Sequence, residues 1–433
     1  MKRNSSTTIF ETAQWFIFIL ASSVAIPIVI GSMFGFNISE IAGLMQRTIF
    51  VVGLTSFLQG WLGHRLPIVE GPAGLWISIF AVMAAAGAQQ GADSMLTLRT
   101  LESTMLFTGL FLVLFGLLKI ANRLMRLFTP LVTGSFLFLL TVQLSGTFLK
   151  GMLGIQQQVE AIHLTEAVLA FVTFFLVLGL STFGRGWLSS YAVLLGIVIG
   201  WVSYVLFVGS TERAAAPLFA PPQWLDWGAP ILDVRMIPIA FLTAVILLSN
   251  VVASILAINQ STKGKPTYTN DQINRGSAFL GVTHGLSGMF SAVANVPLAS
   301  TSGFINLTGQ KRKAPFMYAS ILYMSVAFFP QIVGWISTIP GPIANGALLA
   351  TFVQLMGLGL SNIMSEELDN RRLTIIGISY LIGIGTMFLP AEAFVSFPPF
   401  ARNLASNGLL IGTILVILLE QFWKQDKYSK EKA

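Results

Sequence analysis

Apolar runs alternate with short polar connections along almost the whole chain. A helix needs roughly 20 predominantly apolar residues to cross the hydrocarbon core of a bilayer. Measured against that length, the runs predict fourteen membrane segments. Their expected ranges are 13–34, 41–62, 67–86, 102–119, 128–146, 165–183, 188–208, 236–259, 276–293, 295–308, 314–337, 340–361, 372–390 and 405–423. The pattern indicates an all-α polytopic membrane protein.

Two of these segments, 67–86 and 295–308, are too short or too interrupted to be ordinary spanning helices. Each has a short β-branched piece followed by a proline, Pro72 in the first and Pro297 in the second. Proline disfavours helix in the residue before it, but it suits the first turn of a helix. Each segment is therefore predicted to be a strand followed by a half-helix.

The broken segments occupy matching places in two halves of seven segments each. Pro72 comes 59 residues after the start of the first apolar run at Ala13, and Pro297 comes 60 residues after the run that starts at Ile237. Because seven is odd, the second half inserts upside down, which predicts a 7+7 inverted repeat of the kind found in transporters. The two strands should then meet and satisfy each other's backbone groups, which lipid cannot do.

The basic residues indicate how the chain lies in the membrane. With the N-terminus in the cytoplasm, nineteen of the 25 Lys and Arg fall on the cytoplasmic side and six on the other, as the positive-inside rule requires. We therefore expect a multi-pass protein of the plasma membrane with both termini cytoplasmic, including a tail at 424–433. The basic residues cluster at segment ends rather than on one face, so the net charge of +7 does not indicate a nucleic-acid partner.

Composition narrows the class of protein further. Only 10% of the residues are charged, against roughly 25% in soluble domains. The chain has no cysteine and three histidines, which excludes thiol catalysis and gives no pattern for a metal site. Neither a P-loop nor a nucleophile–base pair is present. We therefore expect a transporter rather than an enzyme, with no metal and no cofactor.

Glu70 is the one carboxylate in a broken segment, and an ionisable residue inside the membrane is by default a functional candidate. It is both a substrate-binding candidate and the candidate for proton coupling. The alternative is a solvated or salt-bridged residue beside Arg65. Ser249 and Asn250 lie in the middle of an apolar segment, and they either bind substrate or form a hydrogen bond between helices.

The half-helix starts supply the remaining binding candidates. Free backbone N–H groups at such a start attract anionic or carbonyl groups, and the hydroxyls could instead serve as N-caps. The candidates are Gly71, Gly74, Leu75, Ala299, Ser300 and Thr301.

Other polar and aromatic residues are interpreted as structural. His284 is expected to form an interhelical contact. The acids Glu102, Glu366, Glu367, Asp369 and Glu392 are expected to be solvated at segment ends, and Trp61, Trp187, Trp224, Trp227 and Trp423 to be interfacial anchors.

Several motifs together resemble the nucleobase–cation symporter family of uracil and xanthine permeases, also called nucleobase–ascorbate transporters. The residues that carry the resemblance are Gln14, Pro27, Pro67, Gly71, the runs Phe128–Gly134 and Ile339–Gly346, Arg275, Gly281, Gly288, Gly303 and Thr308. The resemblance implies fourteen spans, import of a nucleobase that is often coupled to a proton, and often a homodimer. It also implies a core domain, 1–127 and 236–337, that moves against a gate domain, 128–208 and 340–423.

The chain departs from that family at its usual acidic ligands. Ser249 stands at the position of the acid in the eighth span, and Ser300 and Thr301 replace the acid or Gln and the Asn of the signature. Trp15 stands where a His often follows Gln14. Two alternatives therefore stay open: a small-anion carrier of the sulfate-transporter type on the same fold, and an uncoupled facilitator.

Overall fold

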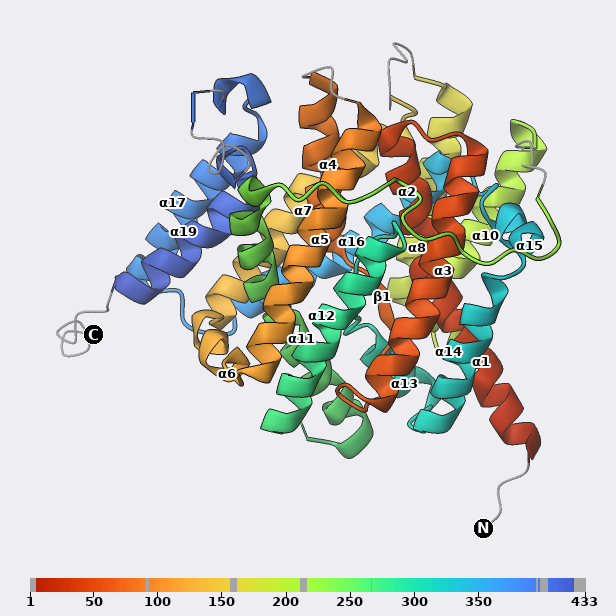
Figure 1. Ribbon diagram of the computed structural model, residues 1–433, viewed down its shortest axis with the longest axis horizontal. Helices are drawn as coiled ribbons and strands as arrows, with labels where there is room; N and C mark the ends of the chain where they lie inside the picture. Colours follow the sequence, from red (N-terminus) through yellow and green to blue (C-terminus); the bar gives the residue numbers. More distant parts are fainter. Residues whose placement is uncertain are drawn as a thin grey trace.

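The computed structural model describes residues 5–89, 93–155, 162–210, 216–265, 267–394, 396–397 and 404–423, and it is mostly helical (Figure 1). The tail 424–433 lies outside these residues. In the first half the main elements are α1 (Ser5–Ser23), α2 (Ala25–Phe34), α3 (Ile38–Trp61), β1 (Glu70–Pro72), α4 (Gly74–Gln89), α5 (Ser94–Leu117), α6 (Ala121–Leu124), α7 (Pro130–Met152), α8 (Leu164–Phe183), α9 (Trp187–Ser190) and α10 (Ala192–Phe207). In the second half they are α11 (Ile237–Lys263), α12 (Asn270–Met289), β2 (Asn295–Pro297), α13 (Thr301–Thr308), α14 (Lys313–Val326), α15 (Pro330–Ile336), α16 (Gly341–Ile363), α17 (Asn370–Met387) and α19 (Gly408–Phe422).

Every expected membrane segment contains at least one of these helices, so the predicted order of segments is confirmed. The predicted boundaries are less accurate, since α5 begins at Ser94 rather than 102 and α12 at Asn270 rather than 276. Two interruptions were not predicted. The helix of segment 13–34 is interrupted at Val24, between α1 and α2, and segment 314–337 bends by 95° between α14 and α15.

The packing of the helices follows the inverted repeat. Helix α12 packs along α5, and α14 packs along α3. Helices α3 and α12 are the second segments of the two halves, and α5 and α14 belong to the two fourth segments. The repeat therefore relates the pair α5–α12 to the pair α14–α3. The pairs α8–α10 and α17–α19 are related in the same way. The fold is therefore a polytopic all-α membrane fold built as a 7+7 repeat.

The two broken segments meet as predicted, through an antiparallel pair of β1 and β2. Glu70 is opposite Pro297, and Pro72 is opposite Asn295. Beyond the strands, the Leu298 N–H donates to the Val69 carbonyl at 2.9 Å. All of these residues except Leu298 are buried, so the extended backbone is satisfied by protein, as a membrane interior requires.

Small residues allow α5 and α12 to cross closely. A Cβ built on Gly281 would lie 2.4 Å from the Gly109 carbonyl oxygen, and one built on Gly109 would lie 2.7 Å from the Gly281 carbonyl oxygen. Backbones that approach this closely leave no space for a side chain, which is the usual reason for glycine at membrane helix crossings.

Replacing Gly281 with alanine is therefore expected to destabilise the protein by roughly 1–3 kcal/mol, the usual range for overpacking. The same helix supplies a matched control, because a Cβ on Gly285 would meet nothing within 4 Å. The apparent melting temperature of the purified protein in detergent should fall for Gly281→Ala and stay unchanged or rise for Gly285→Ala. Equal stability of the two variants would show that the crossing can widen without loss.

Candidate functional site

The half-helices α4 and α13 begin where β1 and β2 end, so their N-termini lie on either side of the paired strands. The two segments interlock at Gly71, because a Cβ there would lie 2.6 Å from a methyl carbon of Leu298. Only glycine leaves space for that leucine without a shift. The strand pair therefore fixes the positions of both half-helix starts relative to each other.

Helix α11 passes the end of β2 and brings a polar face to it. The Ser254 hydroxyl lies 2.8 Å from the Pro297 carbonyl oxygen and 3.3 Å from Asn250 Oδ1, and it can donate to either. Asn250 is half-buried, and its amide nitrogen makes no hydrogen bond within the described residues. Ser249 is buried, and its hydroxyl donates to the Ile246 carbonyl of its own helix at 2.7 Å.

The start of α13 presents one hydroxyl and buries another. Ser300 is exposed, and its side chain makes no capping hydrogen bond with the helix, whereas Ala299 is half-buried. Thr301 is fully buried, and its hydroxyl accepts from the Val69 N–H at 3.3 Å. Thr301 therefore joins α13 to the first broken segment, and Ser300 is the hydroxyl that a ligand could reach.

The start of α4 contacts helices α7 and α16. A Cβ on the half-buried Gly74 would lie 3.2 Å from Phe352 of α16 and 3.6 Å from Leu140 of α7. Leu75 is buried at 3% exposure. Of the nine predicted site residues, the structure leaves four with accessible surface next to the strand pair or on α11. They are Gly74, Asn250, Ala299 and Ser300.

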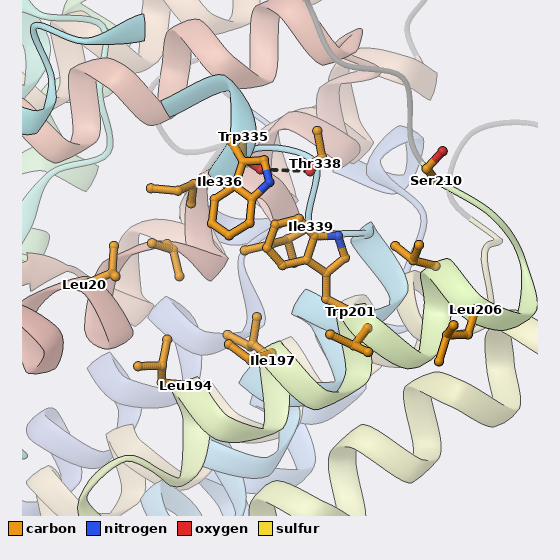
Figure 2. Close-up of a pocket in the computed structure, with 14 residues that line it drawn as sticks. Leu20, Leu194, Ile197, Trp201, Leu206, Ser210, Trp335, Ile336, Thr338 and Ile339 are labelled. Atoms are coloured by element: carbon orange, nitrogen blue, oxygen red, sulfur yellow. Dashed lines mark hydrogen bonds between the residues drawn. The ribbon is translucent and has the colours of Figure 1, made fainter. Parts of the chain in front are cut away.

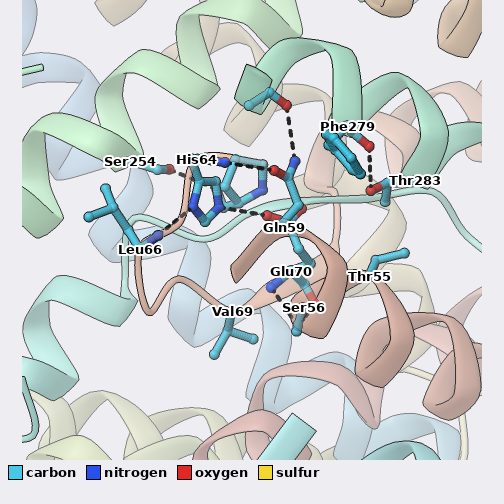
Figure 3. A network of polar contacts seen from close by, with 12 residues as sticks. Thr55, Ser56, Gln59, His64, Leu66, Val69, Glu70, Ser254, Phe279 and Thr283 are labelled. Carbon is cyan, nitrogen blue, oxygen red and sulfur yellow. Dashed lines mark hydrogen bonds and ion pairs between the residues drawn. The ribbon is translucent and has the colours of Figure 1, made fainter. Parts of the chain in front are cut away.

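Glu70 is fully buried, so its interpretation as a solvated residue beside Arg65 is wrong. Its Oε1 atom lies 3.5 Å from Nε2 of His64, and its Oε2 atom has no partner among the described residues. The Glu70 backbone N–H donates to the Ser56 hydroxyl of α3 at 2.9 Å (Figure 3). The side chain therefore lies in a protein pocket beside α3 and not at the aqueous surface.

The hydrogen bonds of His64 define its tautomer. The Leu66 N–H donates to His64 Nδ1 at 3.1 Å, so Nδ1 must carry a lone pair and no proton (Figure 3). The proton of the neutral ring is then on Nε2, which faces Glu70. His64 can therefore donate one hydrogen bond to Glu70, and a second ring proton would displace the Leu66 N–H. Sequence reasoning missed this residue because six positions separate the two in the chain.

A second buried polar cluster joins α3, α5, the connection 216–233 and the loop after α12. Arg47 donates to Asp226 at 2.6 Å and to the Ser291 carbonyl at 3.1 Å. The Ser291 hydroxyl donates to Glu102 at 2.5 Å and accepts from the Trp227 N–H at 3.2 Å.

Two predictions are therefore wrong. Glu102 is fully buried rather than solvated, and Trp227 is 3% exposed rather than an interfacial anchor. Both are buried because the connection between the halves folds inward onto Ser291. The sequence did carry a signal, since Arg47 lies inside the expected segment 41–62 and a cation there needs a partner.

The other residues interpreted as structural largely behave as expected. His284 accepts from the Trp76 indole N–H at 3.0 Å and so joins α12 to α4. Glu366 pairs with Arg372, and Asp369 caps α17. Four tryptophan side chains are exposed, as expected for interfacial anchors. They are Trp61, Trp187, Trp224 and Trp423. The side chain of Glu392 lies outside the described part of the structure.

Comparison with known proteins gives a consistent result over the whole chain. A family model described as a permease family matches residues 6–392. YwdJ of Bacillus subtilis, whose name describes a purine permease, is 32% identical over 423 residues, which are 96% of each chain. The xanthine permease of the same organism is 24% identical over 100% of this chain and 97% of its own. Its uric acid permease PucK is 25% identical over 93% of this chain and 92% of its own.

Solved structures share the fold at low sequence identity. The transmembrane domain of the cyanobacterial bicarbonate transporter BicA matches with a TM-score of 0.63 at 15% identity, over 95% of this chain and 97% of that one. SLC26A9 matches with a TM-score of 0.64 at 13% identity, over 98% of this chain and 67% of that one. At such identities the likeness concerns the fold alone.

Proposed function

Because the chain belongs to the permease family of the xanthine and uric acid permeases, the nucleobase–ascorbate transporters, we propose that it is a secondary transporter that imports a purine or pyrimidine base. The family makes it a nucleobase permease of the membrane, and relatives of this kind are transporters rather than enzymes. The particular base, the route of movement and the coupling to protons are parts of the proposal.

The observation that carries the proposal is the chemistry of the accessible groups at the strand pair. They are the amide of Asn250, the hydroxyl of Ser300 and the backbone at Ala299 and Gly74, with no carboxylate among them. Such groups donate and accept hydrogen bonds at once, as the edges of a nucleobase require. A neutral ring fits them better than a cation, which would lack a counter-charge.

We propose that movement occurs between two groups of helices, the core (residues 1–127 and 236–337) and the gate (residues 128–208 and 340–423). The packing supports this division, because α12 packs on α5, and α14 on α3, within the core. In the gate, α16 packs on α7 and α8. Gly74 at the site faces Phe352 and Leu140 of the gate. The substrate then binds between the groups and crosses when the core slides, as in an elevator.

The proposed orientation has both termini in the cytoplasm, on the basis of the nineteen-to-six distribution of Lys and Arg. Cysteines introduced singly at Ser94 and Lys430 should react with a membrane-impermeant maleimide from opposite sides of intact cells and inverted vesicles. Since the protein has no native cysteine, no background labelling is expected. Reaction of both from one side would contradict the orientation.

The function is tested by uptake into proteoliposomes that contain the purified protein. Radiolabelled xanthine and uracil should enter faster than into protein-free vesicles, and unlabelled hypoxanthine should compete with at least one of them. Sulfate and bicarbonate at the same concentration should not compete. Uptake of sulfate or bicarbonate with no uptake of any base would replace the proposal by an anion carrier on the same fold.

A further inference from the structure

An apolar crevice of about 530 Å³ lies between α10, helix α1, Val24 at the junction of α1 and α2, and helix α15 with the two residues Thr338 and Ile339 that follow it (Figure 2). Only two of its 14 lining residues carry a hydroxyl, Ser210 and Thr338. The Thr338 hydroxyl already donates to the Trp335 carbonyl at 2.8 Å. The crevice therefore offers a ligand almost nothing but hydrocarbon surface and aromatic rings.

Helix α10 supplies one continuous stripe of this surface. The lining residues recur at helical spacing, three or four positions apart, from Leu194 to Leu206. Twelve steps of 1.5 Å make the stripe about 18 Å long. One leaflet contributes half of a hydrocarbon core that is roughly 30 Å thick, or about 15 Å. The crevice is therefore about as long as one leaflet is deep.

The polarity along the crevice has a direction. Ser210 follows the end of α10 that leads into the connection at 209–235, whereas Thr338 lies beside Trp335 near the middle of the crevice (Figure 2). Leu194 and Leu20 lie at the opposite end (Figure 2). Trp201 of α10 and Trp335 of α15 meet across the crevice, with their ring centroids 4.8 Å apart. An occupant with a long apolar tail and a polar end toward residues 209–235 matches this gradient.

Other occupants fit poorly. A helix of a second copy is roughly 10–12 Å wide with its side chains, so it would cover the open side of the crevice rather than fill it. Water is poorly retained in a cavity that lacks polar partners. Val198, Val202 and Leu206 line the crevice and are 44%, 54% and 75% exposed, so this side of the crevice is open to the surroundings of the helix.

We propose that an acyl chain of a membrane phospholipid occupies this crevice, from the leaflet on the side of residues 209–235. That leaflet is the outer one in the orientation proposed above. Binding of the acyl chain in the crevice depends neither on that orientation nor on the identity of the transported base. In terms of the proposed core and gate, the acyl chain lies at their boundary, since α10 belongs to the gate and α1, Val24 and α15 belong to the core.

The proposal is tested with the full-length protein in vesicles that contain a phosphatidylcholine with a diazirine in the middle of one acyl chain. Illumination should attach the lipid to Leu20 and Trp201, which are half-buried and line the crevice. Mass spectrometry of the digested protein locates the adducts. A water-soluble diazirine is applied in parallel to detect an aqueous cavity.

Val198→Phe fills part of the crevice and should lower these adducts about 4- to 15-fold, the effect of excluding one or two methylene groups. Val172→Phe is the matched control, because Val172 is 55% exposed on α8 and does not line the crevice. It should leave the adducts unchanged. Leu194→Trp provides a second filling variant, and retention of a single gel-filtration peak shows that each variant is folded.

Three results would overturn the proposal. Adducts confined to Ile199 and Phe207, which are exposed on α10 but do not line the crevice, would show that lipid stays outside the crevice. Labelling of Trp201 by the water-soluble probe alone would show a hydrated cavity. Protection of Trp201 from both probes, together with a cross-link between protomers at Val198, would show that a second copy covers the crevice.

Discussion

Asn250→Ala is expected to weaken binding of the nucleobase by about 5- to 150-fold, which corresponds to roughly 1–3 kcal/mol for an unsatisfied buried polar group. The half-buried amide of Asn250 is the accessible group beside Ser254 and the strand pair that can donate and accept at the same time. Alanine removes both functions, so a donor and an acceptor of the bound base lose their partners. Equilibrium binding of a radiolabelled base to the purified protein measures the effect directly.

Ser249→Ala is the matched control for this prediction. The Ser249 hydroxyl donates to the Ile246 carbonyl within α11, so its removal should change affinity little. Asn250→Asp adds a second test, because a carboxylate cannot donate and should favour bases that present more donors. If Asn250→Ala binds every tested base as tightly as the parent protein, Asn250 is a packing residue, and the ligand contacts lie elsewhere on the half-helices.

Glu70→Gln is expected to abolish accumulation driven by a pH gradient while exchange of internal for external substrate continues. The amide imitates a protonated carboxyl and can still accept from His64 Nε2. We propose that the loaded carrier moves with Glu70 protonated, so a permanently neutral side chain permits movement but carries no proton. In the parent protein, uptake should fall as external pH rises, because fewer carriers then hold the proton.

The geometry supports Glu70 in this role. Its Oε2 atom is fully buried and without a partner among the described residues, an unfavourable state for a carboxylate inside a membrane. Glu70 is opposite Pro297 in the strand pair, and the Pro297 carbonyl contacts Ser254 beside Asn250. A change of protonation at Glu70 can therefore reach the proposed substrate site through the paired strands β1 and β2.

Glu102→Gln is the matched control for coupling, because Glu102 is equally buried but belongs to the Arg47 cluster. Accumulation should persist in that variant and disappear in Glu70→Gln. Both are measured in proteoliposomes with an imposed inward proton gradient and with radiolabelled base. If the parent protein never accumulates its substrate above equilibrium, the protein is a facilitator, and Glu70 has a structural role beside His64.

The sequence by itself determined the membrane fold to a large extent. The bilayer imposes a fixed length of apolar residues and requires every backbone group to be satisfied, so the segments and the two broken ones could be recognised from hydropathy and from Pro72 and Pro297. The odd number of segments in each half then predicted the meeting of the two strands. The candidate residues Asn250, Ser300 and Glu70 followed from their positions in these segments.

The tertiary structure alone decided which polar groups are accessible and which are used internally. The Ser249 hydroxyl donates to the Ile246 carbonyl and the Thr301 hydroxyl accepts from the Val69 N–H, whereas the Ser300 side chain makes no capping hydrogen bond. Such outcomes depend on the rotation of each helix and on the partner it meets, and hydropathy does not encode either.

The same reason explains the residues that sequence reasoning misplaced. Glu102 and Trp227 are polar or amphipathic residues near segment ends, where solvent is the usual surrounding. They are buried because the connection that carries Trp227 folds onto Ser291, whose hydroxyl donates to Glu102 and accepts from the Trp227 backbone N–H. The neutral tautomer of His64 and the apolar crevice beside α10 likewise arise from neighbours that only the folded chain brings together.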